Sequence, residues 1–280
     1  MSKSKINTKT TTSQFDFGEN WKNFSEHSLS SDKIKQAEKD LKYLINGVNL
    51  SGKAFLDIGF GQGLSLLIAT KLGAKTVGCD INPKCEDILN RNRKFFSSIR
   101  GKQIPIVVGS ILDDAVIEKI KLSSPLYNGK YEIVYSWGVL HHTGDLKKAI
   151  ENSCKLVDKS GYLIIALYNK HWSSRIWLFI KWLYGKSPGI IRKIMIKIFY
   201  PVIWIAKFVV TRRNPKKQSR GMDFYYDVID WVGGYPYEYQ SVQETKDTIE
   251  QYGFSCVKYI PANVPTGCNQ FLFLKNKQDE

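Results

Sequence analysis

Three glycines that follow a short apolar run near residue 60 limit the fold more than any other stretch of the chain. Residues 54–58 read Ala-Phe-Leu-Asp-Ile, which is typical of a buried strand, and Gly59, Gly61 and Gly63 come directly after it. Glycine lets the backbone bend sharply and lets a ligand approach without a Cβ in the way. Residues 64–71 then predict a helix that Gly73 ends. We therefore expect a strand, a tight turn and a helix.

Two carboxylates accompany this unit. Asp57 lies two residues before the first glycine, where its charge would repel a pyrophosphate and would suit a cationic ligand such as an α-ammonium group. Residues 76–80 predict a second buried strand that ends in Asp80, placed to accept two hydrogen bonds from a ribose diol. The dinucleotide-binding fingerprint has Gly or Ala at the position where this chain has Leu64. The residues therefore favour a nucleoside ligand other than a dinucleotide.

The acid, the three glycines and the second acid resemble the pattern of class I S-adenosylmethionine-dependent methyltransferases. The resemblance covers residues 41–167 well and the last 40 residues loosely. It implies S-adenosylmethionine as cofactor and a Rossmann-like, doubly wound α/β fold with a seven-stranded sheet whose last strand is antiparallel. The alternative is an ordinary α/β protein with a glycine turn by chance. The cofactor contacts that the resemblance implies are Asp57, Gly59, Phe60, Gly61, Gly63, Asp80, Ile81, Ser110, Ile111 and Trp137.

The adenine side departs from the family pattern. Many members carry an acid where this chain has Ser110, so the adenine contact passes to the Ser110 hydroxyl, to Asp113 or to backbone. Further along, the predicted strand 130–136 runs into a Leu-His-His stretch that the family often shows. His141 or His142 is a candidate general base, because imidazole titrates near neutral pH. Alternatively, one histidine packs against the cofactor or holds the loop by a backbone hydrogen bond.

Composition divides the chain. Residues 169–222 carry thirteen Lys and Arg and no Asp or Glu, whereas the remainder has 28 basic and 26 acidic residues. We divide the chain into a core (31–168 and 241–280), an insertion after the fifth strand (169–240) and a flexible N-terminal segment (1–30). In that segment, Trp21 and Phe24 either form a lid over the ligands or cover the sheet edge.

The five cysteines and the first residues indicate a compartment. The cysteines are scattered, odd in number and without Cys-x-x-Cys spacing, which argues against a disulfide framework and a structural metal site and favours a reducing cytosol. Residues 1–13 are polar, so we expect disorder there and no signal peptide. The sequence predicts a cytoplasmic protein, with membrane association if its basic segment binds lipid. It does not predict the oligomeric state.

The first half of the insertion, 172–213, alternates aromatic and aliphatic residues with bases. Its longest uncharged run, 198–206, has nine residues and contains Pro201, short of the ~20 that a spanning helix needs. A basic segment rich in Trp and Phe is typical of an interfacial helix on an anionic membrane. Ubiquinone-pathway O-methyltransferases, the branch that this chain looks like, also carry a membrane-touching insertion. A cap over the substrate pocket is the alternative. Binding of RNA is disfavoured, because the fourth strand lacks the Pro-Pro-aromatic or Pro-Cys sequence of base methyltransferases.

The second half, 220–239, mixes acids, aromatics and paired glycines, which predicts either a pocket wall or a structural loop. We expect in-line transfer of a methyl group to a hydroxyl oxygen of a lipophilic or membrane-presented small molecule or glycan. Methylation at nitrogen or carbon of a soluble molecule, and cofactor binding without turnover by a regulator, are the alternatives. The candidate substrate contacts are Trp21, Tyr168, Asp227, Asp230, Tyr235 and Glu238.

Overall fold

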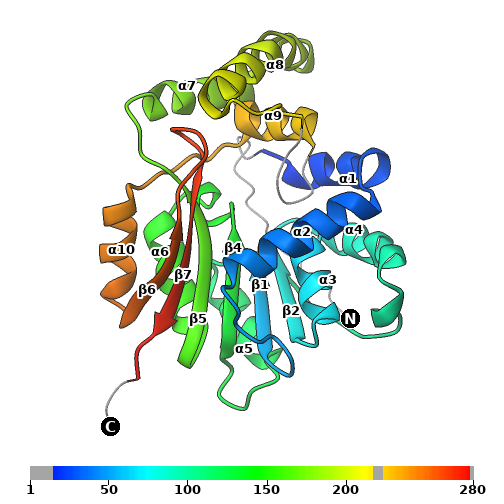
Figure 1. Ribbon diagram of the computed structural model, residues 1–280, viewed down its shortest axis with the longest axis vertical. Coiled ribbons are helices and arrows are strands. Elements are labelled where there is room, and N and C mark those ends of the chain that lie inside the picture. The colour runs from blue at the N-terminus through cyan, green and yellow to red at the C-terminus, as the bar shows by residue number, and fades with distance from the viewer. Residues whose placement is uncertain (1–14, 217–222, 278–280) are drawn as a thin grey trace, which may run out of the picture.

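The computed structural model describes residues 15–216 and 223–277, and it is built on one seven-stranded sheet of order β3-β2-β1-β4-β5-β7-β6 (Figure 1). The first five strands in sequence are parallel, and β7 is antiparallel to both of its neighbours. This arrangement confirms the predicted fold class. The strands are β1 (Ala54–Ile58), β2 (Lys75–Asp80), β3 (Ile106–Val108), β4 (Tyr131–Trp137), β5 (Val157–Tyr168), β6 (Phe254–Ile260) and β7 (Cys268–Lys275).

Alternating side chains of the central strands build a core on each face of the sheet. On β1, Leu56 and Ile58 pack into one core while Phe55 packs into the other, as the two-residue period of a strand requires. The first core is closed by α5 (Asp114–Leu122), α6 (Leu146–Leu156) and α10 (Val242–Glu250). The second core is closed by α2 (Ser31–Leu44), α3 (Leu64–Lys71) and α4 (Lys84–Asn92). The sheet therefore lies between two helical layers.

The segment before α2 is helical where the structure describes it. α1 (Phe17–His27) is capped at its N-terminus by Asp16, whose carboxylate accepts a hydrogen bond from the backbone N–H of Glu19. It is held to α4 by Lys84, which pairs with Asp16 and Glu19 at 3.0 and 3.2 Å. Residues 17–27 therefore form an anchored helix and not the flexible segment we expected. The disorder predicted for 1–13 falls outside the described residues.

The insertion is helical and forms a layer of its own beyond one end of the sheet (Figure 1). α7 (Ser174–Lys186), α8 (Gly189–Thr211) and α9 (Phe224–Gly233) share a small apolar core, to which Met195 and Ile203 of α8 and Val228 and Val232 of α9 contribute. The loop expected over part of 220–239 is thus a helix from Phe224 onward, because its apolar residues are spaced four apart and face α8.

Helix α8 corrects another expectation. It runs for 23 residues through Pro201 without a break. The uncharged run of nine residues lies between Lys197 and Lys207, but neither lysine ends the helix. Among the described residues, α8 is long and apolar enough to cross a membrane by the criteria of length and composition alone.

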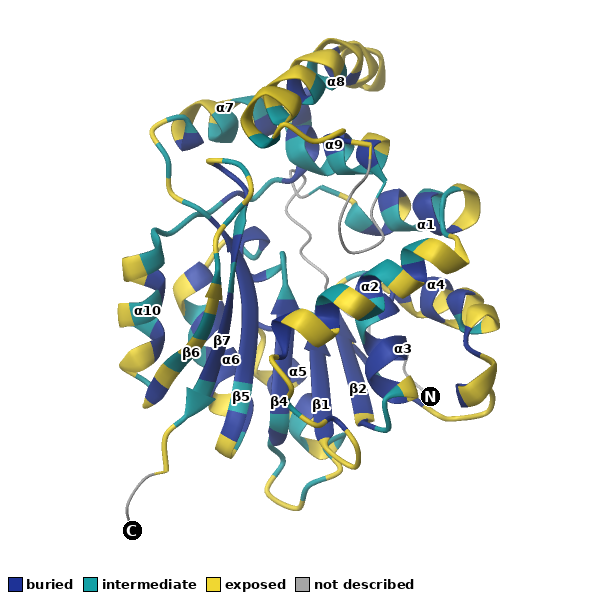
Figure 2. Ribbon diagram, viewed as in Figure 1, coloured by how far each residue is buried: buried dark blue, intermediate teal, exposed yellow. Residues whose placement is uncertain are grey.

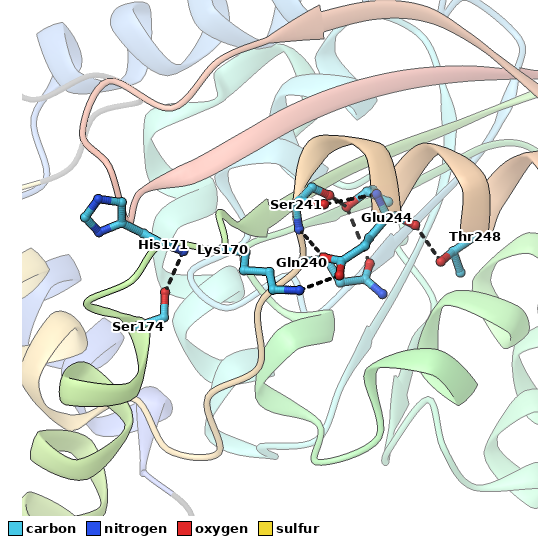
Figure 3. A network of polar contacts seen from close by, with 8 residues as sticks. Lys170, His171, Ser174, Gln240, Ser241, Glu244 and Thr248 are labelled. Atoms are coloured by element: carbon cyan, nitrogen blue, oxygen red, sulfur yellow. Dashed lines mark hydrogen bonds and ion pairs between the residues drawn. The ribbon is translucent and has the colours of Figure 1, made fainter.

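The insertion leaves the sheet and returns to it at one place (Figure 3). Asn169 and Gln240 form a parallel bridge, and the backbone N–H of Lys170 donates to the carbonyl of Gln240 at 3.0 Å. The Lys170 ammonium pairs with Glu244 in the first turn of α10 at 2.5 Å. Both ends of the inserted segment are therefore fixed side by side at the end of β5.

Candidate active site

The turn after β1 presents bare backbone beside a buried carboxylate. Asp57, at 1% exposed, accepts a hydrogen bond from the Ser65 hydroxyl at 2.6 Å. Gly59 has φ +72°, and a Cβ placed there would stand 2.3 Å from a methyl carbon of Val139. A side chain at Gly59 would therefore need both a strained backbone and the displacement of Val139.

Asp80 lies beside this turn at the carboxyl end of the neighbouring parallel strand. One oxygen accepts from the backbone N–H of Gly61 and the other from that of Asn82, each at 2.9 Å. Burial raises the pKa of Asp80, although both hydrogen bonds oppose the shift. Each carboxylate oxygen has a second lone pair, so Asp80 retains the capacity to accept from a diol.

One large cavity of about 1040 Å³ joins this turn to the insertion. That volume is at the upper end of the roughly 300–1,000 Å³ usual for small-molecule pockets, so it has room for two ligands. Five aspartates line it, and two of them are paired with lysine: Asp16 with Lys84 and Asp227 with Lys207. Asp57, Asp80 and Asp230 also line it, and the buried carboxylate of Asp57 suits a cationic ligand.

Most of the expected cofactor contacts line this cavity. Ile81 is 47% exposed, whereas Ile111 is buried, and Ser110 accepts from the backbone N–H of Leu112 through its hydroxyl at 3.2 Å. Trp137 donates its indole N–H to Gln270 at 3.0 Å. Gly63 is the exception, since it caps α3 with φ +77° and is absent from the described lining. The expected contacts among the lining residues are Asp57, Gly59, Phe60, Gly61, Asp80, Ile81, Ser110, Ile111 and Trp137.

Helix α1 brings Trp21 over the glycine turn. A Cβ on Gly61 would lie 2.9 Å from the indole nitrogen of Trp21. The preceding residue, Asn20, donates its amide to Asp230 at 2.7 Å and to the carbonyl of Tyr226 at 3.1 Å. One helix therefore contacts the turn on the sheet and α9 of the insertion.

The two histidines differ in position. His141 is fully buried outside the described cavity lining, and its Nδ1 accepts from the backbone N–H of Tyr168 at 3.3 Å. Burial holds its pKa well below the usual value, and its Nε2 has no hydrogen-bond partner among the described residues. This placement does not fit His141 as a base that touches an acceptor.

His142 does line the cavity, and its ring contacts Phe17 of α1. Its Nδ1 lies 2.5 Å from the carbonyl of Pro236, so Nδ1 carries the proton and donates it. Burial, together with the charge of Lys181, lowers the pKa of His142 to about 3. At neutral pH the imidazole is therefore neutral, and adding a proton to it is unfavourable.

The expected substrate contacts separate into two groups. Trp21, Tyr168, Asp227 and Asp230 line the cavity, whereas Tyr235 and Glu238 are absent from its described lining. Glu238 instead accepts from the backbone N–H groups of Gly144 and Leu146 at 3.2 and 3.1 Å, which caps the start of α6. Tyr235 accepts from the N–H of Phe15 through its carbonyl at 3.0 Å. Glu238 therefore has a structural role at the start of α6, and a substrate contact by Tyr235 stays a prediction.

A buried lysine that the sequence reading missed lies behind this wall. Lys181 of α7 is 2% exposed; its ammonium donates to the carbonyl of Asp230 at 3.3 Å and lies 4.9 Å from the ring centre of Tyr237. Burial lowers its pKa to about 7. The sequence pattern indicates only one of many bases on an amphipathic segment, and the spacing of Lys181 among the apolar residues of α7 is the one local signal of its burial.

Comparison with known proteins gives the architecture a context. Residues 31–199 match a family model described as a methyltransferase domain. Over 164 residues the chain is 27% identical to the ubiquinone biosynthesis O-methyltransferase of Pelagibacter ubique, a match that covers 56% of this chain and 58% of that protein. Over 125 residues it is 31% identical to the mitochondrial ubiquinone biosynthesis O-methyltransferase of Mus musculus, covering 44% of this chain and 31% of the relative. The chain thus matches less than two thirds of each relative.

Solved structures share the fold. The magnesium protoporphyrin IX methyltransferase of Synechocystis PCC 6803, solved with bound SAH, superposes with a TM-score of 0.54 at 15% identity, over 92% of this chain and 94% of that one. A methyltransferase of Haloferax volcanii, solved with its Trm112 activator, superposes with a TM-score of 0.53 at 11% identity, over 94% and 96% of the two chains. At these identities the likeness concerns the fold alone.

Proposed function

Because this chain belongs to the methyltransferase-domain family, we propose that it transfers a methyl group from S-adenosylmethionine to a hydroxyl oxygen of a lipophilic, membrane-presented small molecule or glycan. The observation that carries the proposal is the cavity that joins the glycine turn to an insertion whose outer face is apolar and basic. The relatives named for ubiquinone O-methylation support oxygen as the acceptor atom.

The residues present fit the cofactor. The bare backbone at Gly59 and Gly61 leaves space that a Cβ would fill, and Asp57 supplies a negative charge for the ammonium of the amino-acid part. Asp80 supplies acceptors for the ribose hydroxyls. When bound, the cofactor supplies a methyl group on a positively charged sulfur, which is an activated leaving group. The protein then mainly aligns the reactants, and alignment can supply effective molarities of ~10⁵ M or more.

The outer face of α7 and α8 supports the membrane part of the proposal (Figure 2). α8 packs on α9 through its buried residues, and its opposite face is exposed and apolar, with Ile198 at 58% exposed. Lys193 and Lys197 are exposed beside this face. The exposed apolar side chains of the two helices are Ile176, Phe179, Trp182, Leu183, Ile190, Ile191, Ile194, Ile198, Val202, Ile205, Phe208, Val209 and Val210. Such a face fits a helix that lies in an anionic interface.

The same helix also reaches the cavity. Lys207 and Thr211 of α8, and Arg213 just after it, line the space that the glycine turn closes at the other end. An acceptor held in the bilayer would therefore meet the cavity where α8 ends. A cap without membrane contact would use the same lining, but it gives no reason for the exposed apolar face.

Isothermal titration tests cofactor use. We expect heat on addition of S-adenosylmethionine and of its demethylated product, and we expect Asp57→Asn to lose it, because the buried charge that faces the ammonium is removed. No heat with either ligand for the unaltered protein would contradict the assignment. The matched control is Asp87→Asn, which removes an exposed carboxylate from α4.

Flotation tests membrane contact. We expect the protein to float with phosphatidylglycerol vesicles and to float less with phosphatidylcholine alone, and we expect Ile198→Gln with Ile205→Gln to reduce flotation. Leu122, the last residue of α5, and Tyr127, in the loop that follows, are exposed and lie outside the insertion, so Leu122→Gln with Tyr127→Gln is the matched control. Equal flotation of the unaltered protein and the α8 variant would contradict membrane contact through α8 and would favour a cap over the pocket.

A further inference from the structure

We propose that Asp230 accepts the proton that the acceptor hydroxyl loses. This inference depends on the proposed function and assigns a role in it that neither histidine fits. It rests on the position of Asp230 in the cavity, on the engagement of every other acid and imidazole there, and on the contacts that hold its turn of α9.

The candidates for a proton acceptor in the cavity can be compared one by one. Asp57 accepts from Ser65, and Asp80 accepts two backbone N–H bonds, so both carboxylates are held at the cofactor end. Asp227 is paired with Lys207 at 2.5 Å, and both side chains are largely buried. Asp16 is paired with Lys84. An ion-paired or multiply bonded carboxylate is a weaker base, because its charged form is already stabilised.

Asp230 differs from these acids. Its Oδ1 accepts from Asn20 at 2.7 Å, which is the one hydrogen bond that the carboxylate makes within the described residues. The side chain is half-buried in the cavity wall. One oxygen is thus fixed by the lid helix, and the other remains available to a ligand.

Two contacts fix Asp230 in the wall of the cavity that the glycine turn also lines. Asn20, its donor, is followed in α1 by Trp21, which lies over Gly61 of the cofactor turn. Helix α1 therefore contacts both the glycine turn and Asp230. On the other side, Lys181 donates to the carbonyl of Asp230 and acts as a positioning residue for this turn of α9.

The pKa of Asp230 bears on how readily it can take the proton of a given hydroxyl group. Burial, reinforced by the charge of Asp227, raises the pKa of Asp230 to about 8. Proton transfer is most effective when the pKa values of donor and acceptor are close, and a phenol has a pKa of about 10, against about 16 for water. Aromatic side chains of the lining, Tyr168, Trp137 and Trp231, offer surfaces on which a ring can stack.

The step balances in atoms and charge. The hydroxyl oxygen forms a bond to the methyl carbon while the carbon–sulfur bond breaks, and its electron pair stays on sulfur, which becomes a neutral thioether. The hydroxyl proton passes to the carboxylate of Asp230 and from there to water. The groups that act on Asp230 are Asn20 on α1, Lys181 on α7, Asp227 on α9 and Tyr168 at the end of β5, and Asp227 is itself paired with Lys207 of α8.

The first test needs no acceptor. Carbon-13 NMR of protein labelled at the aspartate carboxyl carbons, with the demethylated cofactor bound, would follow each carboxyl from pH 4 to 10, and Asp230→Asn would assign the signal. We expect a midpoint near pH 8 and a shift of that midpoint when dodecyl 3,4-dihydroxybenzoate is added. A midpoint below pH 6, or no response to the added phenol, would overturn the proposal.

The second test uses the same probe in phosphatidylglycerol vesicles with methyl-labelled cofactor. We expect Asp230→Asn to lower kcat by ~10²-fold or more and to remove the rise of rate with pH near 8, while heat of cofactor binding is unchanged. Asp87→Asn should match the unaltered enzyme. A rate for Asp230→Asn within threefold of the unaltered enzyme would overturn the proposal. Failure of the unaltered enzyme to methylate the probe would count against the proposed function, and the NMR titration would still decide the role of Asp230.

Discussion

At the scale of single residues, two glycines with almost the same backbone angle have different surroundings. Gly59 has φ +72° and Gly52 has φ +76°, but a Cβ on Gly59 would overlap Val139, whereas a Cβ on Gly52 would meet nothing within 4 Å. The left-handed conformation costs a non-glycine residue roughly 1–2 kcal/mol at either position. Only Gly59 adds a steric requirement inside the site.

This pair gives a prediction. We expect Gly52→Ala to lower the free energy of unfolding by about 1–2 kcal/mol and to leave cofactor affinity unchanged. Gly59→Ala should lose more stability and weaken cofactor binding at least tenfold, and Val139→Ala in the same chain should restore part of both. Urea unfolding and isothermal titration measure these effects. Equal losses for the two glycine variants would show that the crowding at Val139 has no effect.

How well single residues could be predicted depends on how local their environment is. Asp57 and Asp80 were found because a carboxylate at a strand end and a glycine turn are near each other in sequence. The burial of His141 depends on Tyr168 and Lys181, which are 27 and 40 residues away, and no local pattern contains that information. The engagement of Asp227 by Lys207 is hidden for the same reason.

At the scale of elements, helix ends decide the roles of two glutamates. Glu244 closes a capping box with Ser241 at the start of α10 and pairs with Lys170 (Figure 3). Glu238 caps α6 from a distant part of the chain. The first motif is written in four consecutive residues and could be predicted from sequence. The second joins residues more than 90 positions apart, so Glu238 was taken for a substrate contact.

We predict that Glu244→Ala lowers the free energy of unfolding by about 1 kcal/mol, while Glu244→Gln, which keeps the cap, costs roughly half of that. The Lys170 hydrogen bond lowers the pKa of Glu244 to about 2. A lowered pKa contributes stability that is present above the unfolded value near 4.5 and is lost as the pH falls toward 2. Urea unfolding at pH 7 and pH 3 measures it, and equal losses for both variants would contradict a separate cap.

Glu238 gives a matching prediction. Glu238→Gln should lower the unfolding midpoint, because an amide accepts two backbone N–H bonds less well than a carboxylate at a helix start. Cofactor affinity and the KM for an acceptor should be unchanged. Thermal unfolding and titration calorimetry provide the two readouts, and a change in KM with no change in stability would return Glu238 to the substrate site.

At the scale of the whole molecule, Lys181 is the point where insertion and sheet meet. It contacts Asp230 of α9, Tyr168 at the end of β5 and Tyr237 in the returning loop. A buried amine of this kind is often replaceable by an apolar side chain of similar volume without loss of stability. Its charge therefore opposes folding at neutral pH while its contacts order the junction.

The sign of the pH effect can be stated. The pKa of Lys181 falls from 10.5 to about 7 on folding. Between these values the unfolded chain holds a proton that the folded protein has released, so stability rises with pH over this window. We predict that Lys181→Met is more stable than the unaltered protein at pH 6 by about 1–3 kcal/mol, and that the gain shrinks toward pH 10. Urea unfolding at four pH values tests this; a loss of stability at pH 6 would contradict it.

The alternation of strands and helices follows from patterns along the chain, and the resemblance to methyltransferases implied a doubly wound seven-stranded sheet with an antiparallel last strand; both predictions are confirmed. The order of the strands was not predicted. The packing of α7, α8 and α9 was not predicted, because these helices bury their residues against each other and against Phe15, which precedes α1. Their apolar spacing is consistent with a membrane, a cap or a second small core, and only the folded arrangement separates the faces.

The adjacency of Asn169 and Gln240 has an evolutionary consequence. Because the chain departs and re-enters at one pair of bridged residues, the three helices between them can be exchanged without disturbing the order of the strands, provided that the returning stretch with Glu238 still caps α6. A descendant of this protein could acquire a new acceptor by swapping that single contiguous piece of gene, while the machinery that grips the methyl donor is inherited intact.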